Sequence, residues 1–407
     1  MHTHHGRRLS NGILREQKGG AILPSIKSKL LSGTMKSVKP ILTGIDVAGQ
    51  RKGLELMRYI HPKAKGAQLQ PAEDCPLPGT WAVPTDQPLE GKVILYTHGG
   101  AYVSGSPSTH EPLICRLAEQ CRLPVLAYEY RLAPEFPHPA ALQDAVAAFD
   151  YLLSKGYRPG DIALCGDSAG GGLSLALALY LRDQGRELPA ALVLLSPWTD
   201  LTESLDSHYQ NPSIDPLISS EELREMALLY AAGQDLHTPY ISPLFGCFEG
   251  LPPTLIHVGS HEVLLDDARE LALRMEDAGV EVDIDIYEGM WHVFHMFDVE
   301  EARDAIRKIR FFLHTQWELD GLRRRTVRPG QVYRHFKGQR YRVLAVARHS
   351  ETLEELVVYQ QLYGSGGVWV RPLSMFLEPV ERDGKTGYRF EEESADTADT
   401  SADPAAD

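Results

Sequence analysis

The chain has 407 residues, of which 43% are hydrophobic and 24% charged, and its formal net charge is -14. This length allows more than one folded unit, and the acidic total argues against general nucleic-acid binding. The five cysteines are scattered without CxxC spacing, so the sequence predicts no zinc site and no disulfide framework, and a cytoplasmic location. It also contains no secretory signal pattern and no run of 18 apolar residues, so no membrane span is expected.

The N-terminal region is basic and changes character along its length. Residues 1–20 are polar and are predicted to be disordered. From residue 22 to 42, apolar residues recur three or four positions apart with lysines between them, which predicts one or two amphipathic helices. Residues 66–90 are rich in Pro and Gly and predict loop with short strands.

Between residues 92 and 317, short apolar runs alternate with helical patterns. Such alternation predicts βαβ units and a mostly parallel sheet covered by helices on both faces. Residues 201–231 interrupt it with an irregular and then helical segment. The predicted strands are 92–97, 124–128, 161–165, 191–195, 254–258 and 282–287, and the predicted helices are 144–153, 172–182, 267–278 and 300–317.

After residue 321 the pattern becomes strand-like runs bounded by glycines, which predicts a small β-rich domain over 322–380. Residues 381–407 are acidic and low in complexity, and are predicted to be disordered. The aromatic and basic residues of the small domain allow two interpretations. They bind an anionic ligand or nucleic acid, or they fill and solvate an ordinary small barrel. These residues are Tyr333, His335, Tyr341, Tyr359, Trp369 and Arg371.

The pentapeptide 166–170, Gly-Asp-Ser-Ala-Gly, matches the G-x-S-x-G pattern of a nucleophilic serine. It lies between a predicted strand and a predicted helix, which is the context that the pattern requires. The sharp turn would expose the Ser168 hydroxyl at the carboxyl end of the sheet. The N–H of Ala169 would then lie at a helix N-terminus, where it can bind an oxyanion.

A second motif, His98-Gly99-Gly100, follows the first predicted strand of the alternating region. Two glycines allow the backbone to approach a substrate carbonyl with its N–H groups pointing inward. Gly99 and Gly100 are therefore the predicted oxyanion-hole donors, together with Ala169. His98 is interpreted as a structural residue that holds the loop.

The base should lie late in the chain, because the order in hydrolases with this elbow is serine, acid, histidine. His292 and His295 are the candidates, and His292 is favoured because it comes directly after the sixth strand. The loop after the fifth strand offers Glu262 and Asp266 as the acid that orients the imidazole. Glu262 is favoured because it is closer to the strand end, whereas Asp266 suits the start of the next helix.

Six segments together resemble the hormone-sensitive-lipase family of microbial esterases, in family order over roughly residues 75–315. They are HGGAY at 98–102, YRLAPEFPHPAAL at 130–142, GDSAGG at 166–171, LSPWTDL at 195–201, VGSHEVLLDDA at 258–268 and AGVEVDIDIYEGMWHVF at 278–294. In that family the acid is often an Asp in a DPL sequence, whereas here Glu262 stands in EVL. The C-terminal segments RPGQVYRHFKGQRYRVL at 328–344, ARHSETLEELVVYQ at 347–360 and GVWVRPLSMF at 367–376 resemble a small bacterial family of unknown function.

The resemblance implies an α/β-hydrolase fold over 21–321 with a helical cap from 21–65 and 200–235. The rival interpretation of the basic N-terminal helices is a membrane-surface anchor. The implied function is hydrolysis of short- to medium-chain acyl esters of small-molecule substrates, without metal or cofactor. The resemblance also implies a homodimer formed through the last strand and helix of the hydrolase. Alternatives are an amide deacylase of the same family, a non-catalytic binding protein, or an esterase recruited by its C-terminal domain to a nucleic acid or protein.

Overall fold

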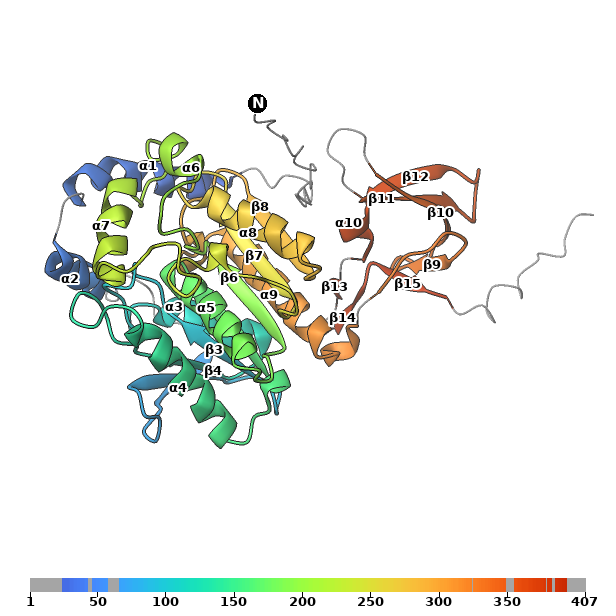
Figure 1. Cartoon of the computed structure of the whole chain (residues 1–407). Coiled ribbons are helices and arrows are strands. Elements are labelled where there is room, and N and C mark those ends of the chain that lie inside the picture. Colours follow the sequence, from blue (N-terminus) through green and yellow to red (C-terminus); the bar gives the residue numbers. More distant parts are fainter. Residues whose placement is uncertain are drawn as a thin grey trace, which may run out of the picture.

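The computed structural model describes residues 24–42, 46–57, 66–323, 325–348, 355–377, 379–382 and 385–393. Its main part is an eight-stranded sheet with the strand order β1-β2-β4-β3-β5-β6-β7-β8 (Figure 1). β3 to β8 are parallel to one another, and β1 and β2 are antiparallel at one edge. The strands are β1 Ala67–Pro71, β2 Gly79–Pro84, β3 Val93–Thr97, β4 Val125–Tyr128, β5 Ile162–Asp167, β6 Ala191–Leu195, β7 Thr254–Gly259 and β8 Val282–Tyr287.

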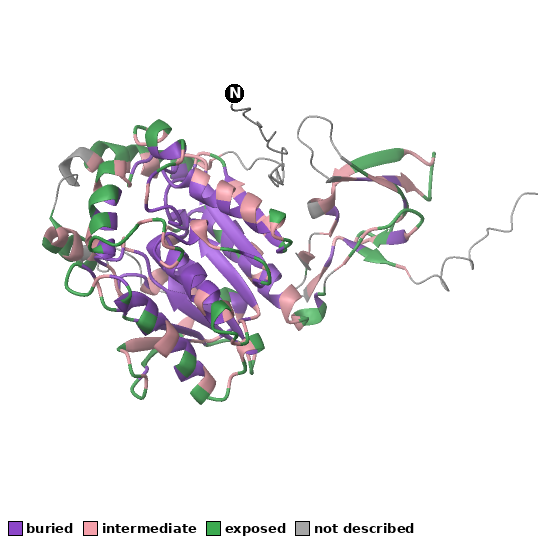
Figure 2. Ribbon diagram, in the orientation of Figure 1, coloured by how far each residue is buried: buried purple, intermediate pink, exposed green. Residues whose placement is uncertain are grey.

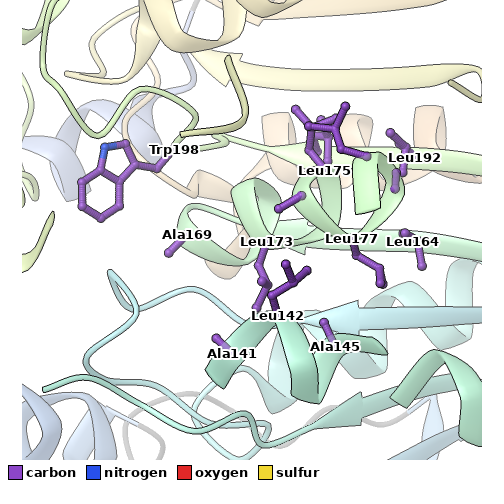
Figure 3. Close-up of a cluster of buried hydrophobic side chains, with 14 of the residues drawn as sticks. Ala141, Leu142, Ala145, Leu164, Ala169, Leu173, Leu175, Leu177, Leu192 and Trp198 are labelled. Atoms are coloured by element: carbon purple, nitrogen blue, oxygen red, sulfur yellow. The ribbon is translucent and has the colours of Figure 1, made fainter. Parts of the chain in front are cut away.

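The central strands are buried along their whole length, which explains why their sequences are continuous apolar runs and not alternating ones. Two clusters of buried hydrophobic side chains lie on the two faces of the sheet. The ribbon of the sheet between them is coloured as buried in Figure 2. Helices α4 Ala140–Ser154, α5 Ala169–Asp183 and α8 Leu265–Asp277 cover one face, and α3 Glu111–Cys121 and α9 Glu300–Gln316 cover the other. Figure 3 shows side chains of α5 packed against Leu142 and Ala145 of α4. The predicted α/β-hydrolase fold with a mostly parallel sheet is confirmed.

Helix α3, Glu111–Cys121, was not predicted: no element was expected between residues 98 and 123. It begins at Glu111 with Pro112 in its first turn, a position where the missing N–H of proline has no cost. Its buried residues Leu113, Leu117 and Cys121 recur four apart, which is the signal that would have identified it.

Four helices lie over the carboxyl ends of the strands and form the cap (Figure 1). They are α1 Ile26–Leu42, α2 Val47–Met57, α6 Ser207–Gln210 and α7 Ser220–Ala231. Arg51 of α2 donates hydrogen bonds to the carbonyls of Val103 (2.7 Å) and Ala133 (2.9 Å), so α2 is held on the hydrolase core. No helix in the described part of the chain combines the length and apolar character needed to cross a membrane. The predicted disordered residues 1–20, and residues 58–65 of the expected cap, lie outside the described residues.

The C-terminal unit has a five-stranded antiparallel sheet of order β12-β11-β10-β9-β15 and a separate hairpin of β13 and β14. Tyr333 and Tyr359 are buried in its core, in agreement with the ordinary interpretation of these aromatic residues, whereas Trp369 is exposed. The elements are β9 Val332–His335, β10 Arg340–Arg348, β11 Glu355–Gln361, β12 Val368–Pro372, α10 Leu373–Leu377, β13 Pro379–Arg382, β14 Lys385–Tyr388 and β15 Phe390–Glu392.

Strands β14 and β15 correct the expectation that disorder begins at residue 381. The ring of Phe390 in β15 is buried and stacks on Phe376 of α10, with ring centroids 4.1 Å apart. One apolar residue in an acidic segment therefore completes the core of this unit, and composition alone does not reveal it. The rest of the predicted tail, residues 383–384 and 394–407, lies outside the described residues.

The burial of the central strands predicts a large cost for truncating one of their side chains. Leu194 of β6 is fully buried, so Leu194→Ala should lower the free energy of unfolding by about 2–5 kcal/mol. Leu228→Ala on the exposed side of α7 is the matched control and should change it by less than about 0.5 kcal/mol. Guanidinium unfolding followed by fluorescence measures both, and equal effects would contradict the assignment of the core.

Candidate active site

Ser168 occupies a strained turn between β5 and α5. Its backbone angles are φ 53° and ψ −124°, and α5 begins at the next residue. The flanking glycines are required by close approaches: a Cβ at Gly166 would lie 2.3 Å from the carbonyl oxygen of Gly170, and one at Gly170 would lie 2.1 Å from that of Thr97. The pentapeptide thus forms the predicted elbow because only glycine fits on both sides of the serine.

The buried Asp167 carboxylate ties this elbow to the loop after β3. It accepts hydrogen bonds from the Tyr96 hydroxyl and, at 3.0 Å, from the Gly99 N–H, and His110 Nε2 lies 3.3 Å away. Burial would raise the pKa of Asp167, but the charge of His110 and these hydrogen bonds lower it below its usual range. Asp167 therefore remains ionised and holds the two loops in contact.

The prediction that the Gly99 N–H is an oxyanion donor disagrees with its hydrogen bond in the structure. Because its N–H already donates to Asp167, it is not available to a substrate. Among the described residues, the N–H groups of Gly100, Ala101 and Ala169 have no acceptor. Gly100 has φ 120° and Ala101 φ 52°, so the chain turns sharply there and Ala101 takes the place expected of Gly99. A Cβ at Gly100 would lie 2.2 Å from the Ser104 carbonyl oxygen, which explains the glycine.

His292 and Glu262 are brought together at the same edge of the sheet. His292 Nδ1 lies 3.0 Å from Glu262 Oε2, and both side chains are buried. The other Glu262 oxygen accepts hydrogen bonds from the Gly259 N–H (2.5 Å) and the Ser196 hydroxyl (2.7 Å). With Nδ1 donating to the carboxylate, Nε2 of a neutral imidazole is the nitrogen that can accept a proton.

The two alternative residues face other partners. Asp266 accepts a hydrogen bond of 2.9 Å from the Ser207 N–H, so it holds the start of α6. His295 is buried against His257, with parallel rings 5.5 Å apart. Neither residue forms a hydrogen bond with His292, so the structure favours Glu262 over Asp266 as the partner of the imidazole.

Ser196 is a site residue for which the sequence analysis gave no role. It follows β6 and, besides donating to Glu262, accepts a hydrogen bond of 3.1 Å from the Val293 N–H. The preceding residue, Leu195, accepts a hydrogen bond of 2.9 Å from the Ser168 N–H. Ser196 thus links the loops that carry Glu262 and His292 next to the Ser168 turn. The sequence signal that could have identified Ser196 is its position directly after a buried parallel strand, since site residues lie at the carboxyl ends of such strands.

The charge of Glu262 sets the acid–base behaviour of His292. Burial disfavours the imidazolium, but the hydrogen bond to Glu262 and the negative charge of that carboxylate outweigh burial and raise the pKa of His292 above its usual range. The pair resembles an acid–base dyad in which the carboxylate stabilises the protonated imidazole.

The cap is connected to the loop that carries Glu262. The Asn211 side chain donates a hydrogen bond to the Glu262 carbonyl (2.7 Å), and the Asp215 carboxylate accepts one from the Val263 N–H (2.9 Å). Lys39 of α1 in turn donates to three carbonyls of the same cap segment, those of Pro212 (3.1 Å), Asp215 (2.8 Å) and Ile218 (2.5 Å). The N-terminal helix α1 therefore supports the loop that carries Glu262 through the 211–218 segment.

Residues 94–296 match a family described by its α/β-hydrolase fold. An acetyl-hydrolase of Streptomyces hygroscopicus is 45% identical over 58% of this chain and 79% of its own length. The chain belongs to the α/β-hydrolase family. An esterase of Acinetobacter venetianus is 40% identical to this hydrolase over 56% of this chain and 76% of the relative.

Solved structures place the hydrolase among esterases of the hormone-sensitive-lipase type. The crystal structure of an esterase from the bacterial hormone-sensitive lipase family is 38% identical, covers 72% of this chain and 98% of that chain, and aligns with a TM-score of 0.69. The C-terminal residues 331–392 match a different family, described as a protein of unknown function (DUF1653). This α/β-hydrolase is an enzyme of the esterase type with a second unit attached.

The Glu262–His292 contact predicts a shift in the pH dependence of kcat/KM. His292 must be neutral to accept a proton, so activity should rise with pH through its raised pKa. In Glu262→Gln the stabilising charge is gone, the pKa falls, and the acidic limb of the profile should move to lower pH. Turnover should also drop by roughly a hundredfold or more, because the imidazolium loses its counter-charge.

Asp266→Asn is the matched control for this experiment, since Asp266 is the alternative acid. It should leave the position of the acidic limb unchanged. A shift in Asp266→Asn combined with none in Glu262→Gln would show that the wrong carboxylate has been assigned.

The contacts of Lys39 predict an effect of the cap on catalysis. Lys39→Met removes the donor to three carbonyls and should lower kcat/KM for a short-chain ester by about tenfold, since hydrogen bonds from a charged group contribute about 1.5–3 kcal/mol. Steady-state kinetics measure this. Lys36→Met, an exposed lysine of the same helix, is the control, and an equal loss in both variants would contradict the specific role of Lys39.

Proposed function

We propose that this hydrolase cleaves carboxylic esters with short to medium acyl chains through a covalent acyl-enzyme, with Ser168 as nucleophile, His292 as base and Glu262 as acid. The observation that carries the proposal is the buried His292–Glu262 hydrogen bond of 3.0 Å, at the same edge of the parallel sheet as a serine on a strained strand-to-helix turn. The names of the similar proteins, acetyl-hydrolase and esterase, agree with it.

In the first half of the proposed reaction, the Ser168 hydroxyl oxygen attacks the ester carbonyl carbon while His292 Nε2 takes its proton. The carbonyl oxygen becomes negative and is bound by the N–H groups of Ala169, Gly100 and Ala101. Collapse of this intermediate breaks the bond to the alcohol oxygen, which receives the proton from His292. The products of this half are the alcohol and the acyl-Ser168 ester.

In the second half, His292 takes a proton from water, and the resulting hydroxide attacks the acyl carbon. The same N–H groups bind the second oxyanion. Its collapse releases the carboxylic acid and returns the proton from His292 to Ser168. Glu262 stabilises the imidazolium in both halves without taking its proton.

The packing of the cap supports a preference for shorter acyl chains. Tyr230 of α7 stacks on Tyr102, which follows the oxyanion loop, with ring centroids 3.8 Å apart and planes within 5°. Trp198, which follows β6, is fully buried, and its ring centroid lies 6.0 Å from that of Tyr102. Three large buried rings next to the loop leave less room for a long acyl chain than small side chains would, and the family of relatives includes an ethyl acetate hydrolase.

A series of p-nitrophenyl esters from acetate to palmitate tests this proposal. The wild type should be most active on the short members, and Ser168→Ala should lose roughly a thousandfold or more of kcat, because the nucleophile is removed. Ser174→Ala is the matched control: Ser174 lies in α5, the helix that directly follows Ser168, is buried, and its hydroxyl has no hydrogen-bond partner in the structure.

The control distinguishes loss of the nucleophile from a general loss of folding or activity. Ser174→Ala should retain the activity of the wild type. A folded wild type that hydrolyses no ester of the series would contradict the proposal, and the same variants would then be assayed on acyl amides, the substrates of the alternative amide deacylase.

A further inference from the structure

The outer strand of the C-terminal sheet, β12, has an unusual surface for an edge strand. Its residues Val368, Trp369 and Val370 are consecutive, apolar and 56%, 54% and 57% exposed. β11 is its only neighbour among the strands that the structure describes. Edge strands of soluble proteins are normally protected by charges, bulges or covering segments, because their free N–H and C=O groups pair readily with another strand.

The hydrogen-bond pattern shows which groups of β12 point outward. The Gln361 N–H donates to the Gly367 carbonyl at 2.9 Å, so these two residues form a hydrogen-bonded pair of the antiparallel ladder. Hydrogen-bonded and non-hydrogen-bonded pairs alternate along such a ladder. The N–H and C=O groups of Val368 and Val370 therefore point away from β11. Pro372, which has no N–H, falls at the next outward position, where a ladder bond is not lost.

We propose that β12 pairs with β12 of a second copy of this chain, antiparallel and centred on Val370. Val370 is the middle residue of the strand Val368–Pro372, so this register overlaps the two strands completely. The two Val370 residues would exchange N–H···O bonds across the axis. Each Val368 N–H would donate to the Pro372 carbonyl of the other copy, and the missing N–H of Pro372 would leave only one acceptor without a bond at each end.

The side chains support a second copy over an unrelated extended peptide, because the strand is complementary to itself. In this register Trp369 of each copy lies opposite Arg371 of the other, so the dimer contains two such pairs. Each pair allows a cation–π contact. Arg371 is already oriented on that face, since its Nε donates to the Tyr359 hydroxyl at 3.3 Å. On the other face Val358, opposite Val370 in the ladder, would extend an apolar strip across both copies.

Sedimentation velocity of the full chain over a range of concentrations tests the association. The wild type should form a dimer, and Val370→Glu should be monomeric, because it places two carboxylates opposite each other at the axis. Leu69→Glu is the matched control: Leu69 is 36% exposed on β1, the edge strand of the large sheet, and this variant should remain dimeric. A monomeric wild type, or a dimer that Val370→Glu leaves intact, would overturn the proposal.

Disulfide trapping tests the register. In a Cys247→Ser background, which removes the exposed native thiol, Val370→Cys should give a reducible covalent dimer, since facing Cα atoms in a hydrogen-bonded pair are about 5.5 Å apart. Val368→Cys is equally exposed, but the two copies of residue 368 would be four residues apart along the strands, about 13 Å, and should not cross-link.

Equal trapping of both cysteine variants, or trapping of Val368→Cys alone, would overturn the proposed register. Ester turnover and the melting temperature are measured for every variant to show that the chain is folded. The association is independent of the proposed catalysis, so a dimer without esterase activity would contradict only the function, and an active monomer only the dimer.

Discussion

The candidate site depends on the buried carboxylate of Glu262. A charge that is removed from water is tolerated only where hydrogen bonds and opposite charge replace its hydration. Glu262 obtains them from the Gly259 N–H, the Ser196 hydroxyl and His292. These three partners come from the ends of β7 and β6 and from the loop after β8, so satisfying one buried charge also fixes the relative positions of three loops.

Asp167 does the same for the other half of the site. Its carboxylate holds the loop after β3 to the elbow through the Gly99 N–H, and so determines which N–H groups remain available. The site is thus positioned by two buried carboxylates at one edge of a parallel sheet. Both carboxylates act through hydrogen bonds to the loops around Ser168. These hydrogen bonds explain how the strained serine turn is kept in one conformation.

The C-terminal unit shows how composition and structure can disagree. Its acidic last segment is typical of disorder, yet Phe390 within it stacks on Phe376 and closes the aromatic core. The aromatic residues that suggested a ligand surface divide between two roles: Tyr333 and Tyr359 are buried, and Trp369 is exposed on an edge strand. Whether an aromatic side chain fills a core or faces solvent is decided by the strand register, which composition does not contain.

The sequence by itself determined the alternating βα order, the serine elbow and the position of His292, because strand burial and glycine-bounded turns leave local patterns. Only the tertiary structure decided that Glu262 and not Asp266 meets His292, that Ala101 replaces Gly99 as a free donor, and that Ser196 joins the loops. Each of these depends on contacts between residues that are 30 to 68 positions apart in the chain, and such contacts leave no signature in a local pattern.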